Sequence, residues 1–406
     1  MRIVIDATAA VSGGKVYLTQ LLSHAAQLDL AHEFIIFHTD DFAEVPAAAG
    51  RRFQFRRIGL PALTSGHWRG ASLLRMLWRL IVLPWHLHRL RPDLLFSNAG
   101  FAPGWRPAQT KLIVALHNSM PLHDELVRTE GSRAERLRLV WLRRLLRKTL
   151  RHCDGVIVFS QDLKQRVMAQ ADDLDGEPAV IYHGIEWGEA ERQLKPDPAQ
   201  LGRLGIRRPY LLCVSQCQRY KNLLRLLDAF ASLLAEHPDL SLVLVGPLTD
   251  PTYWKEVEQA IARLGGGSRV TLIPGLARDE LKAIYRAALA FVYPSLAENC
   301  PFAVLEALAF GLPIAASRIS SLPEIGGEAA VYFDPYDPAE IAAVLNQLIN
   351  RESLREELSR KAVARAKLFS WPESVRQTLR VFERVTEMNV EGSEESYRLS
   401  HPPTPE

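Results

Sequence analysis

Two carboxylates with regular spacing are the first candidates for chemistry. Glu298 and Glu306 have seven residues between them in the run PSLAENCPFAVLEALAFGLPIAAS, which begins at Pro294. The preceding segment LAFVYPS predicts a strand, and Pro301 suits the first position of a following helix. Glu298 is therefore expected in the loop between them and Glu306 in the second turn of the helix.

The start of this helix is expected to bind an anion. A loop after a parallel strand, followed by N–H groups at a helix start, accommodates a diphosphate. Glu306 would then accept hydrogen bonds from two ribose hydroxyls, and Glu298 would face hydroxyls of a sugar being transferred. The alternative is two solvated surface glutamates. The helix start in this donor-binding prediction comprises Pro301, Phe302, Ala303 and Val304.

A second loop carries cations after a predicted strand, in the run VSQCQRYKNLLRLLDAF from Val214. Arg219 and Lys221 could hold the β-phosphate and stabilise the charge that develops on a leaving nucleoside diphosphate. A basic loop that only adds solubility is the alternative. Asn222 is expected to cap the next helix, whose apolar residues recur on one face.

Near the N-terminus, Ser12, Gly13 and Gly14 follow the strand-like run RIVID and precede a helical pattern. Because glycine has no side chain, the backbone there could approach a phosphate or a sugar closely. An ordinary turn is the other reading of a lone Gly-Gly pair.

The elements that position these residues alternate along the whole chain. Apolar strand-like runs separated by helical patterns argue for βα units on parallel sheets. A chain of 406 residues fits two domains. Prolines and scattered charges between residues 184 and 209 suggest a linker. The expected strands are RIVID, FIIFH, DLLFS, KLIVAL and GVIVFS in the first half and YLLCVS, LSLVLVG, RVTLIPG, LAFVYPS and PIAAS in the second.

These features predict an α/β chain of two Rossmann-like, doubly wound parallel-sheet domains facing across a cleft. Residues 1–190 would form an acceptor-side domain and residues 191–371 a donor domain. A helix over about 372–388 would pack back on the first domain. Residues 389–406 lack apolar content and are expected to be disordered.

With these pieces in place, the chain resembles glycosyltransferase family 4, the group 1 glycosyltransferases of the GT-B fold. The resemblance covers nearly the whole chain and rests on four segments. They are the Glu-x7-Glu run, the loop with Lys221 and Asn222, GLPIAASRISSLPEIGGEAAVYFDP from Gly311, and FSW at Phe369.

The resemblance implies metal-independent, retaining transfer from a nucleoside diphosphate sugar by front-face attack, with the leaving phosphate helping to deprotonate the acceptor. Lys221 matches the family's phosphate-binding lysine, Glu306 its ribose ligand and Glu298 its donor-sugar contact. Many members have Gly-Arg where this chain has Ser215 and Gln216. Either Arg219 replaces that contact or the phosphate is held less tightly.

The resemblance implies further site residues. His117, at the end of KLIVAL, matches a histidine that faces the donor sugar, so the expected catalytic residues are Glu298, His117 and Lys221. The loop IPGL, with Gly275 and Leu276, resembles a base-binding loop. HGIE at His183 resembles a structural turn. The pair of aspartates in DLD, which begins at Asp173, has metal-binding spacing but is interpreted as solvated charge.

Basic residues and tryptophans occur together over residues 67–91 and 128–151. Such helices suit an anionic membrane surface, and the acceptor would then be a saccharide or a lipid-linked saccharide at the cytoplasmic membrane face. Solvated helix faces are the alternative. No nucleic-acid-binding signature accompanies the basic patches, so no nucleic-acid partner is expected.

Composition and simple sequence signals limit the cellular location and the class of protein that the chain can belong to. The four cysteines form no CxxC pair, and no signal peptide or membrane-spanning run is recognisable, which together predict a cytoplasmic protein. No GxGxxG follows the first strand, which disfavours a dinucleotide oxidoreductase. No cofactor is expected besides the donor substrate. A nucleotide-sugar epimerase, an inverting transferase and a non-catalytic nucleotide-binding scaffold remain as alternatives.

Overall fold

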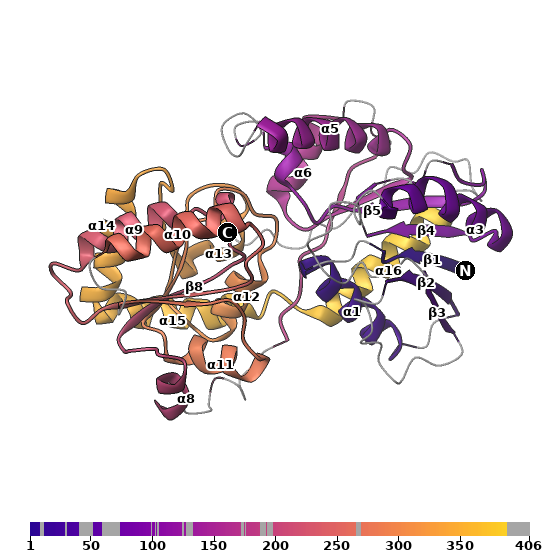
Figure 1. The fold of residues 1–406 in the computed structure, drawn as a ribbon. Coiled ribbons are helices and arrows are strands. Elements are labelled where there is room, and N and C mark those ends of the chain that lie inside the picture. The colour runs from indigo at the N-terminus through magenta and orange to yellow at the C-terminus, as the bar shows by residue number, and fades with distance from the viewer. Residues whose placement is uncertain are drawn as a thin grey trace. The chain divides into compact units, whose positions relative to one another are not determined.

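The computed structural model of the chain divides into two compact units (Figure 1). Unit 1 comprises residues 1–122, 137–184 and 371–404, and unit 2 comprises residues 123–136, 185–370 and 405–406. The residues that the structure describes are 1–8, 12–28, 31–39, 52–58, 74–98, 100–101, 103, 105–123, 126, 133–171, 174, 176–186, 192, 198–264 and 269–387.

Unit 1 is built on a parallel sheet of seven strands in the order β3-β2-β1-β4-β5-β6-β7. Its central strands are buried and rich in Ile, Val, Leu and Phe, as strands covered on both faces must be. The strands are β1 (Arg2–Asp6), β2 (Glu33–His38), β3 (Phe53–Arg57), β4 (Leu94–Ser97), β5 (Lys111–Ala115), β6 (Gly155–Val158) and β7 (Ala179–Val180).

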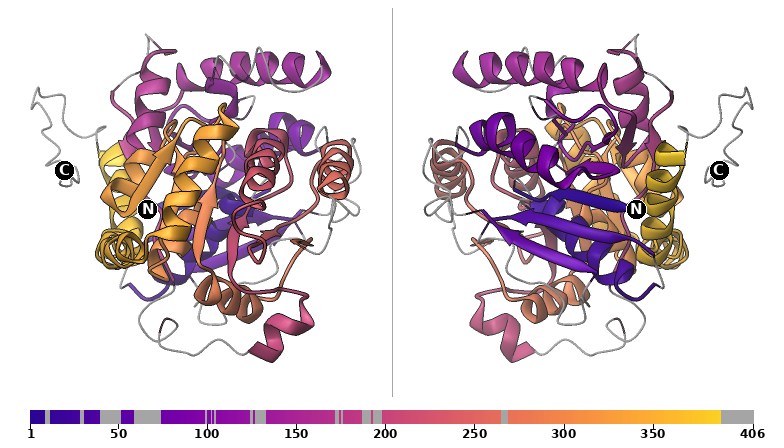
Figure 2. Two further views of the ribbon diagram at one scale, coloured as in Figure 1. Left: turned by 90° about the vertical axis from the view of Figure 1, so that its left-hand side faces the viewer. Right: turned by 90° about the vertical axis from the view of Figure 1, so that its right-hand side faces the viewer.

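Helices cover this sheet, and the last of them comes from the far end of the chain. Helix α16 (Trp371–Glu387) packs against α1 (Ser12–Ala25) and against β5 and β6, and Figure 2 shows it in yellow beside the sheet. Tyr17 and Thr378 share a buried hydrogen bond of 2.9 Å between the two helices. The other helical elements are η2 (Trp78–Val82, a π-helix), α3 (Leu83–Leu90), η3 (Met120–Leu122), α5 (Arg133–Leu150) and α6 (Gln161–Met168).

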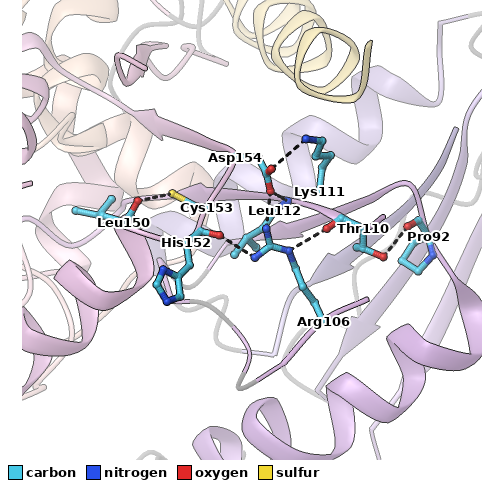
Figure 3. A network of polar contacts seen from close by, with 9 residues as sticks. All are labelled: Pro92, Arg106, Thr110, Lys111, Leu112, Leu150, His152, Cys153 and Asp154. Atoms are coloured by element: carbon cyan, nitrogen blue, oxygen red, sulfur yellow. Dashed lines mark hydrogen bonds and ion pairs between the residues drawn. The ribbon is translucent and has the colours of Figure 1, made fainter. Parts of the chain in front are cut away.

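A polar cluster joins two loops at the amino ends of β5 and β6 (Figure 3). The Asp154 carboxylate accepts hydrogen bonds from Arg106 at 2.7 Å, from Lys111 at 3.2 Å and from the Leu112 N–H at 2.8 Å. Arg106 also donates to the carbonyl of His152, just beyond α5. The cluster thereby ties the carboxyl end of α5 to the sheet.

Unit 2 carries a parallel sheet of six strands in the order β10-β9-β8-β11-β12-β13. The strands are β8 (Tyr210–Val214), β9 (Ser241–Val245), β10 (Val270–Ile273), β11 (Ala290–Tyr293), β12 (Ile314–Ser317) and β13 (Ala330–Phe333). The helical elements are α8 (Pro198–Arg203), η4 (Arg219–Lys221), α9 (Leu223–Leu233), α10 (Pro251–Arg263), α11 (Arg278–Ala287), α12 (Phe302–Ala309), α13 (Leu322–Gly326), η5 (Gly327–Ala329), α14 (Pro338–Asn350) and α15 (Glu352–Ala366).

In each sheet, the direction in which the chain adds new strands reverses at one place, the switch point. In unit 1 the chain builds outward from β1 to β3 and then returns to add β4 on the other side of β1, and in unit 2 it does the same about β8 and β11. Open α/β sheets bind ligands at the carboxyl ends of strands beside such a switch point. The predicted fold class, two doubly wound parallel sheets, is confirmed.

Three local predictions need correction. Asn222 occupies the N-cap position of α9 as expected, but it has a φ of 60° and its side chain makes no capping hydrogen bond. Its Oδ1 accepts from Arg225 at 2.9 Å, and its amide donates to the carbonyls of Pro294 and Pro335. Pro301 lies one position before α12, which begins at Phe302. Helix α1 begins at Ser12, so Gly13 and Gly14 lie within its first turn rather than before it.

Candidate functional site

The loops after β8 and β11 meet at the switch point of unit 2, because these two strands are paired neighbours. The Leu296 N–H in the second loop donates to the carbonyl of Tyr220 in the first, at 2.7 Å. Lys221 and Glu298 come from these loops, and Lys221 Nζ lies 2.5 Å from Glu298 Oε1. The structure therefore brings two of the predicted catalytic residues into direct contact.

This ion pair is nearly shielded from water, since Lys221 is 7% exposed and Glu298 is 8% exposed. Lys221 Nζ also donates to the hydroxyl of Tyr293 at 3.0 Å and lies 4.7 Å from the ring centre of Tyr220. Burial lowers the pKa of Lys221, but Glu298 and the two tyrosines outweigh it and raise that pKa well above its usual range. The ammonium therefore keeps its charge in a poorly hydrated site, where charge acts more strongly on a bound anion.

The backbone at Glu298 is held by a residue that the sequence interpretation missed. The Ser320 hydroxyl accepts the N–H of Glu298 at 2.9 Å and donates to the carbonyl of the same residue at 2.6 Å. Ser320 follows β12 and has a φ of 59°, a backbone conformation that L residues rarely adopt and that is frequent near functional sites. The available signal was its place after a strand in the segment PIAASRISS.

Glu306 lies on α12, in its second turn as predicted, and is half-buried. Its Oε2 accepts a hydrogen bond of 2.8 Å from the hydroxyl of Tyr285 on α11. Burial raises the pKa of the Glu306 carboxyl to about 7, although the hydrogen bond from Tyr285 and the charge of Arg278 lower it. Near neutral pH this carboxyl can therefore gain or lose a proton.

The predicted helix start occupies the carboxyl end of β11. Phe302, Ala303 and Val304 form the first turn of α12, with Pro301 directly before it. The Val304 N–H donates to the Pro301 carbonyl at 3.1 Å. This N–H is therefore engaged within the turn, so a bound anion would use the amides nearer the start of α12.

Arg219 and Gln216, from the loop after β8, have different surroundings from Lys221. The Arg219 guanidinium forms a two-pronged ion pair with Glu256 of α10, one contact being 2.9 Å, and lies over the ring of Tyr253. Gln216 is half-buried in the same loop. The structure does not bring Arg219 to the Lys221–Glu298 pair.

The loop after β10 is open to solvent. Gly275 is exposed, Leu276 is half-buried, and a Cβ atom added at Gly275 would meet nothing within 4 Å. Asp173 and Asp175, the acidic residues of DLD, lie outside the described residues. Among the residues that are described, no group of three or more His, Cys, Asp or Glu side chains is arranged to hold a metal ion.

In unit 1 the switch point joins Gly14, Asn98 and His117. Asn98 Nδ2 donates to the Gly14 carbonyl at 3.1 Å, so its Oδ1, 2.7 Å from His117 Nε2, must accept the imidazole proton. Burial lowers the pKa of His117 to about 3, which keeps the ring neutral with an unprotonated Nδ1. A Cβ atom at Gly14 would lie 3.1 Å from Asn98 Nδ2, so the absence of a side chain permits this approach.

Asn98 was missed although it directly follows DLLFS and the end of β4, much as His117 directly follows KLIVAL. His183 packs with tilted rings against Phe159 and Trp371, with ring centres 4.2 Å and 5.9 Å away, and stacks on His117 at 5.8 Å. This packing matches the structural role expected of the HGIE turn.

In the two basic segments, residues 67–91 and 128–151, some of the described side chains are exposed and others are buried. Trp85 and Trp141 are exposed, and Arg89 stacks on Trp85 at 4.0 Å. Trp78 belongs to the hydrophobic core, so it does not contribute to the exposed surface of its segment.

Two of the basic residues are engaged within unit 1. Arg79 pairs with the buried Asp6 at 2.7 Å, and Arg143 donates to the Pro121 carbonyl at 2.6 Å. Residues 67–73 and 128–132 lie outside the described part. None of the described helices is long and apolar enough to cross a membrane.

Comparison with known proteins identifies the family of both halves. Residues 202–365 match the profile of Glycosyl transferases group 1, and residues 11–187 match that of Glycosyltransferase Family 4. A D-inositol 3-phosphate glycosyltransferase of Corynebacterium kroppenstedtii is 31% identical over 347 residues, which are 81% of this chain and 68% of that protein.

Other relatives match more locally. The O-antigen chain mannosyltransferase B of Escherichia coli is 33% identical over 176 residues, 43% of this chain and 45% of that protein. With two further relatives the alignments span 53% and 43% of their lengths, so the chain matches about half of each of these three proteins.

Solved structures show the same fold at low identity. Sucrose-phosphate synthase from Thermosynechococcus elongatus superposes with a TM-score of 0.74 at 18% identity, covering 96% of this chain and 100% of that one. Anabaena HepE in complex with UDP-glucose gives 0.68 at 18% identity, covering 95% and 100%. Together with the two profiles, these matches establish that the chain has the GT-B fold and belongs to glycosyltransferase family 4, the group 1 glycosyl transferases.

Proposed function

We propose that this protein is a retaining glycosyltransferase that moves a hexosyl group from a nucleoside diphosphate sugar to a saccharide or lipid-linked saccharide. The observation that carries the proposal is the buried Lys221–Glu298 pair on adjacent loops at the unit 2 switch point, with Glu306 on the helix that follows. Membership of a glycosyltransferase family supports it. Relatives named for O-antigen and inositol phosphate chemistry support a role in cell-surface polysaccharide or glycolipid synthesis.

Each site residue receives a role in this proposal. Lys221 and the first-turn amides of α12 bind the diphosphate, Glu306 binds the ribose and Glu298 contacts the sugar. Neutral His117 and the Gly13–Gly14 backbone are further proposed donor contacts, Gln216 and Arg219 extend the phosphate contacts, and Gly275 and Leu276 meet the base. That HepE was solved with UDP-glucose makes UDP the first nucleotide to test.

The reaction needs no metal in this proposal. The bond from the anomeric carbon to the β-phosphate oxygen breaks, and the acceptor hydroxyl oxygen bonds to that carbon on the same face. The hydroxyl proton passes to the departing phosphate, whose growing negative charge is stabilised by Lys221 and the helix amides. An inverting transferase, a nucleotide-sugar epimerase and a scaffold that only binds nucleotide are the competing functions.

The acceptor is proposed to lie at an anionic membrane surface on the cytoplasmic side, where the protein binds peripherally. Exposed Trp85 with Arg89, and exposed Trp141 with Arg144, Arg147 and Lys148, support this partner. Each cation near such a surface adds about 1 kcal/mol of attraction.

Calorimetry and product analysis test the proposal. Glu306→Ala should weaken binding of the matching nucleoside diphosphate, found by a thermal-shift comparison of UDP with GDP, by at least about tenfold, since hydrogen bonds to a charged group are lost. Glu298→Ala should lower turnover with little change in that affinity. Equal losses of affinity in both variants would reject the division of roles.

The transfer assay separates the competing functions. The product should keep the anomeric configuration of the donor, and activity should survive EDTA. An inverted product, or loss of activity on chelation that magnesium or manganese restores, would refute the corresponding part of the proposal. Nucleotide binding without transfer to any saccharide or lipid-linked acceptor would favour the scaffold.

A further inference from the structure

Tyr285 is a buried tyrosine whose hydroxyl reaches into the proposed nucleotide site from a neighbouring helix. It belongs to α11, and its Oη lies 2.8 Å from Glu306 Oε2 and 3.3 Å from the carbonyl oxygen of Ala303, both on α12. The hydroxyl has a single proton to donate, so the shorter contact to the carboxylate is the main hydrogen bond and the carbonyl shares the same proton. One side chain thus links the first turn of α12 to the carboxylate in its second turn.

The position of this hydroxyl is fixed by packing. The Tyr285 ring stacks on Phe310 with ring centres 5.4 Å apart and planes 7° apart, and on Phe291 at 5.8 Å. Tyr285 is fully buried. Because a side chain held between two rings cannot adopt other rotamers without breaking the stacks, the position of the hydroxyl oxygen is set before any ligand arrives.

The hydroxyl also remains a donor at any physiological pH. Burial, followed by the negative charge of Glu306, raises the pKa of Tyr285 well above its usual range. A phenol that does not ionise can stabilise the neighbouring carboxylate by a charge-assisted hydrogen bond, which is stronger than one between neutral groups.

We propose that Tyr285 is the positioning residue of the nucleotide site: by holding Oε2 of Glu306, it favours the ionised carboxylate and leaves Oε1 as the acceptor for the ribose hydroxyls. The proposal rests on the proposed function, because it assumes that Glu306 binds the ribose. It goes further in naming the residue that prepares Glu306 for binding.

The charge balance at Glu306 makes this role measurable. Its carboxyl titrates near neutral pH because burial raises the pKa to about 7, and the two groups that lower it, Tyr285 and Arg278, both come from α11. Elements β12, α13 and α15 also pack on α12; α13 carries Glu324, and α15 carries Arg365, whose guanidinium donates to the carbonyls of Ile325 and Glu324. Without the Tyr285 hydroxyl the carboxyl would take up a proton at higher pH.

The test is a pH series of nucleotide affinities. Kd for UDP and GDP is measured by calorimetry between pH 6 and 9 for the full chain, for Tyr285→Phe, for Glu306→Gln and for the double variant. Tyr285→Phe should bind the matching nucleotide roughly five- to tenfold more weakly at pH 7 and recover most of that affinity by pH 9, because raising the pH restores the carboxylate. In the Glu306→Gln background the same substitution should change Kd by less than about twofold, since the carboxylate it supports is gone.

Tyr210→Phe is the matched control. Tyr210 is also fully buried, and its hydroxyl donates at 2.6 Å to the carbonyl of Ile284 on α11, but it does not contact Glu306. This variant loses a buried hydrogen bond to the same helix and should keep the affinity and pH profile of the unmodified protein. Thermal unfolding of each variant shows that unit 2 is folded.

The outcomes are distinct. A weakening by Tyr285→Phe that is constant from pH 6 to 9, or that Tyr210→Phe reproduces, would mean a general packing loss and would overturn the proposal. Equal effects of Tyr285→Phe with and without Glu306 would overturn it as well, and so would an unchanged Kd. If the unmodified protein binds neither UDP nor GDP, or if Glu306→Gln binds as well as the unmodified protein, the proposed function of Glu306 fails and this inference fails with it.

Discussion

Glu306 illustrates how a binding residue can work against the stability of its own domain. Removing a carboxylate from water disfavours the charged form, and here burial raises the pKa from 4.5 to about 7. A group whose pKa is higher in the folded state stabilises the fold below its unfolded pKa, and this contribution is lost as the pH rises through 7. At pH 8 and above, the ionised Glu306 carboxylate therefore lowers the free energy of unfolding of the nucleotide-free protein by up to ~3 kcal/mol.

We therefore predict that Glu306→Gln raises the free energy of unfolding of unit 2 at pH 8.5 by an amount approaching ~3 kcal/mol, and changes it far less at pH 4.5. Denaturant unfolding of the nucleotide-free protein measures this difference. The unfolding transition of unit 2 is identified in a separate experiment as the one that added nucleotide shifts. A gain of the same size at both pH values would show that the carboxylate charge is not the cause.

The predicted residues and the missed ones differ in what they contact. Lys221, Glu298 and Glu306 could be named from the sequence because they occur together in loops after strands and in a helix, at the spacing of a family motif. Taken singly, charged residues at such places are more often solvated surface residues. Tyr285 and Ser320 act through other side chains or backbone groups. A tyrosine inside a helix and a serine after a strand look like ordinary core and turn residues, so only the three-dimensional contacts reveal them.

Among the elements, ten strands were predicted and three were missed. All ten apolar runs correspond to strands, including β10 at the edge of its sheet. Strand β3 is partly exposed and contains two arginines, and β7 has two residues, so neither gives the continuous apolar run that signals a strand in sequence. Strand β13 does give such a run, AVYF, with the same burial pattern as β10, but its segment was interpreted only as a family motif.

Helix α5 is the element on which the predicted binding to an anionic membrane surface depends. Arg144, Arg147 and Lys148 are exposed on it, whereas Arg143 is held by the Pro121 carbonyl and contributes to folding. We predict that changing Arg144, Arg147 and Lys148 to glutamate releases the protein from vesicles that contain anionic lipid while nucleotide affinity is unchanged. Salt screens the attraction between these cations and anionic lipid over ~8 to 10 Å, so vesicle binding should also weaken steeply as the salt concentration rises.

Vesicle co-sedimentation measures this effect, and unit 2 offers the control. Arg203, Lys255 and Arg263 are exposed on α8 and α10, and their replacement by glutamate makes the same change in net charge. The control variant should stay bound. Release of both variants to the same extent would show that overall charge, rather than α5, governs binding. If the unmodified protein does not bind anionic vesicles, the prediction is wrong.

Over the whole molecule, the segment from residue 185 to 370 in unit 2 interrupts the chain of unit 1. Its two ends lie together, because Ile185 and Ser370 form a parallel bridge and the Ile185 N–H donates to the Phe369 carbonyl at 3.1 Å. Just outside them, a Cβ atom at Gly184 would come within 2.2 Å of the Trp371 nitrogen, so only glycine fits there.

We predict that a chain ending at residue 370 keeps unit 2 folded and able to bind nucleotide, while unit 1 loses its structure because α16 is missing from β5 and β6. Limited proteolysis with mass spectrometry should show a protected fragment beginning near residue 185, and UDP or GDP should increase its protection. Complete digestion of both units would mean that unit 2 depends on unit 1 for its stability.

The hydrogen bond between Tyr17 and Thr378 also has a consequence for how the protein is made. Its partners are 361 residues apart, and at about 5–20 residues per second a ribosome needs roughly 20 to 70 seconds to synthesise the chain between them. During that time the entire segment of unit 2 from 185 to 370 is synthesised, whereas the unit 1 sheet still lacks the helix that covers β5 and β6. The earlier half of the polypeptide is therefore the later one to finish folding, and it is the half in which a nascent-chain chaperone would find apolar surface to protect.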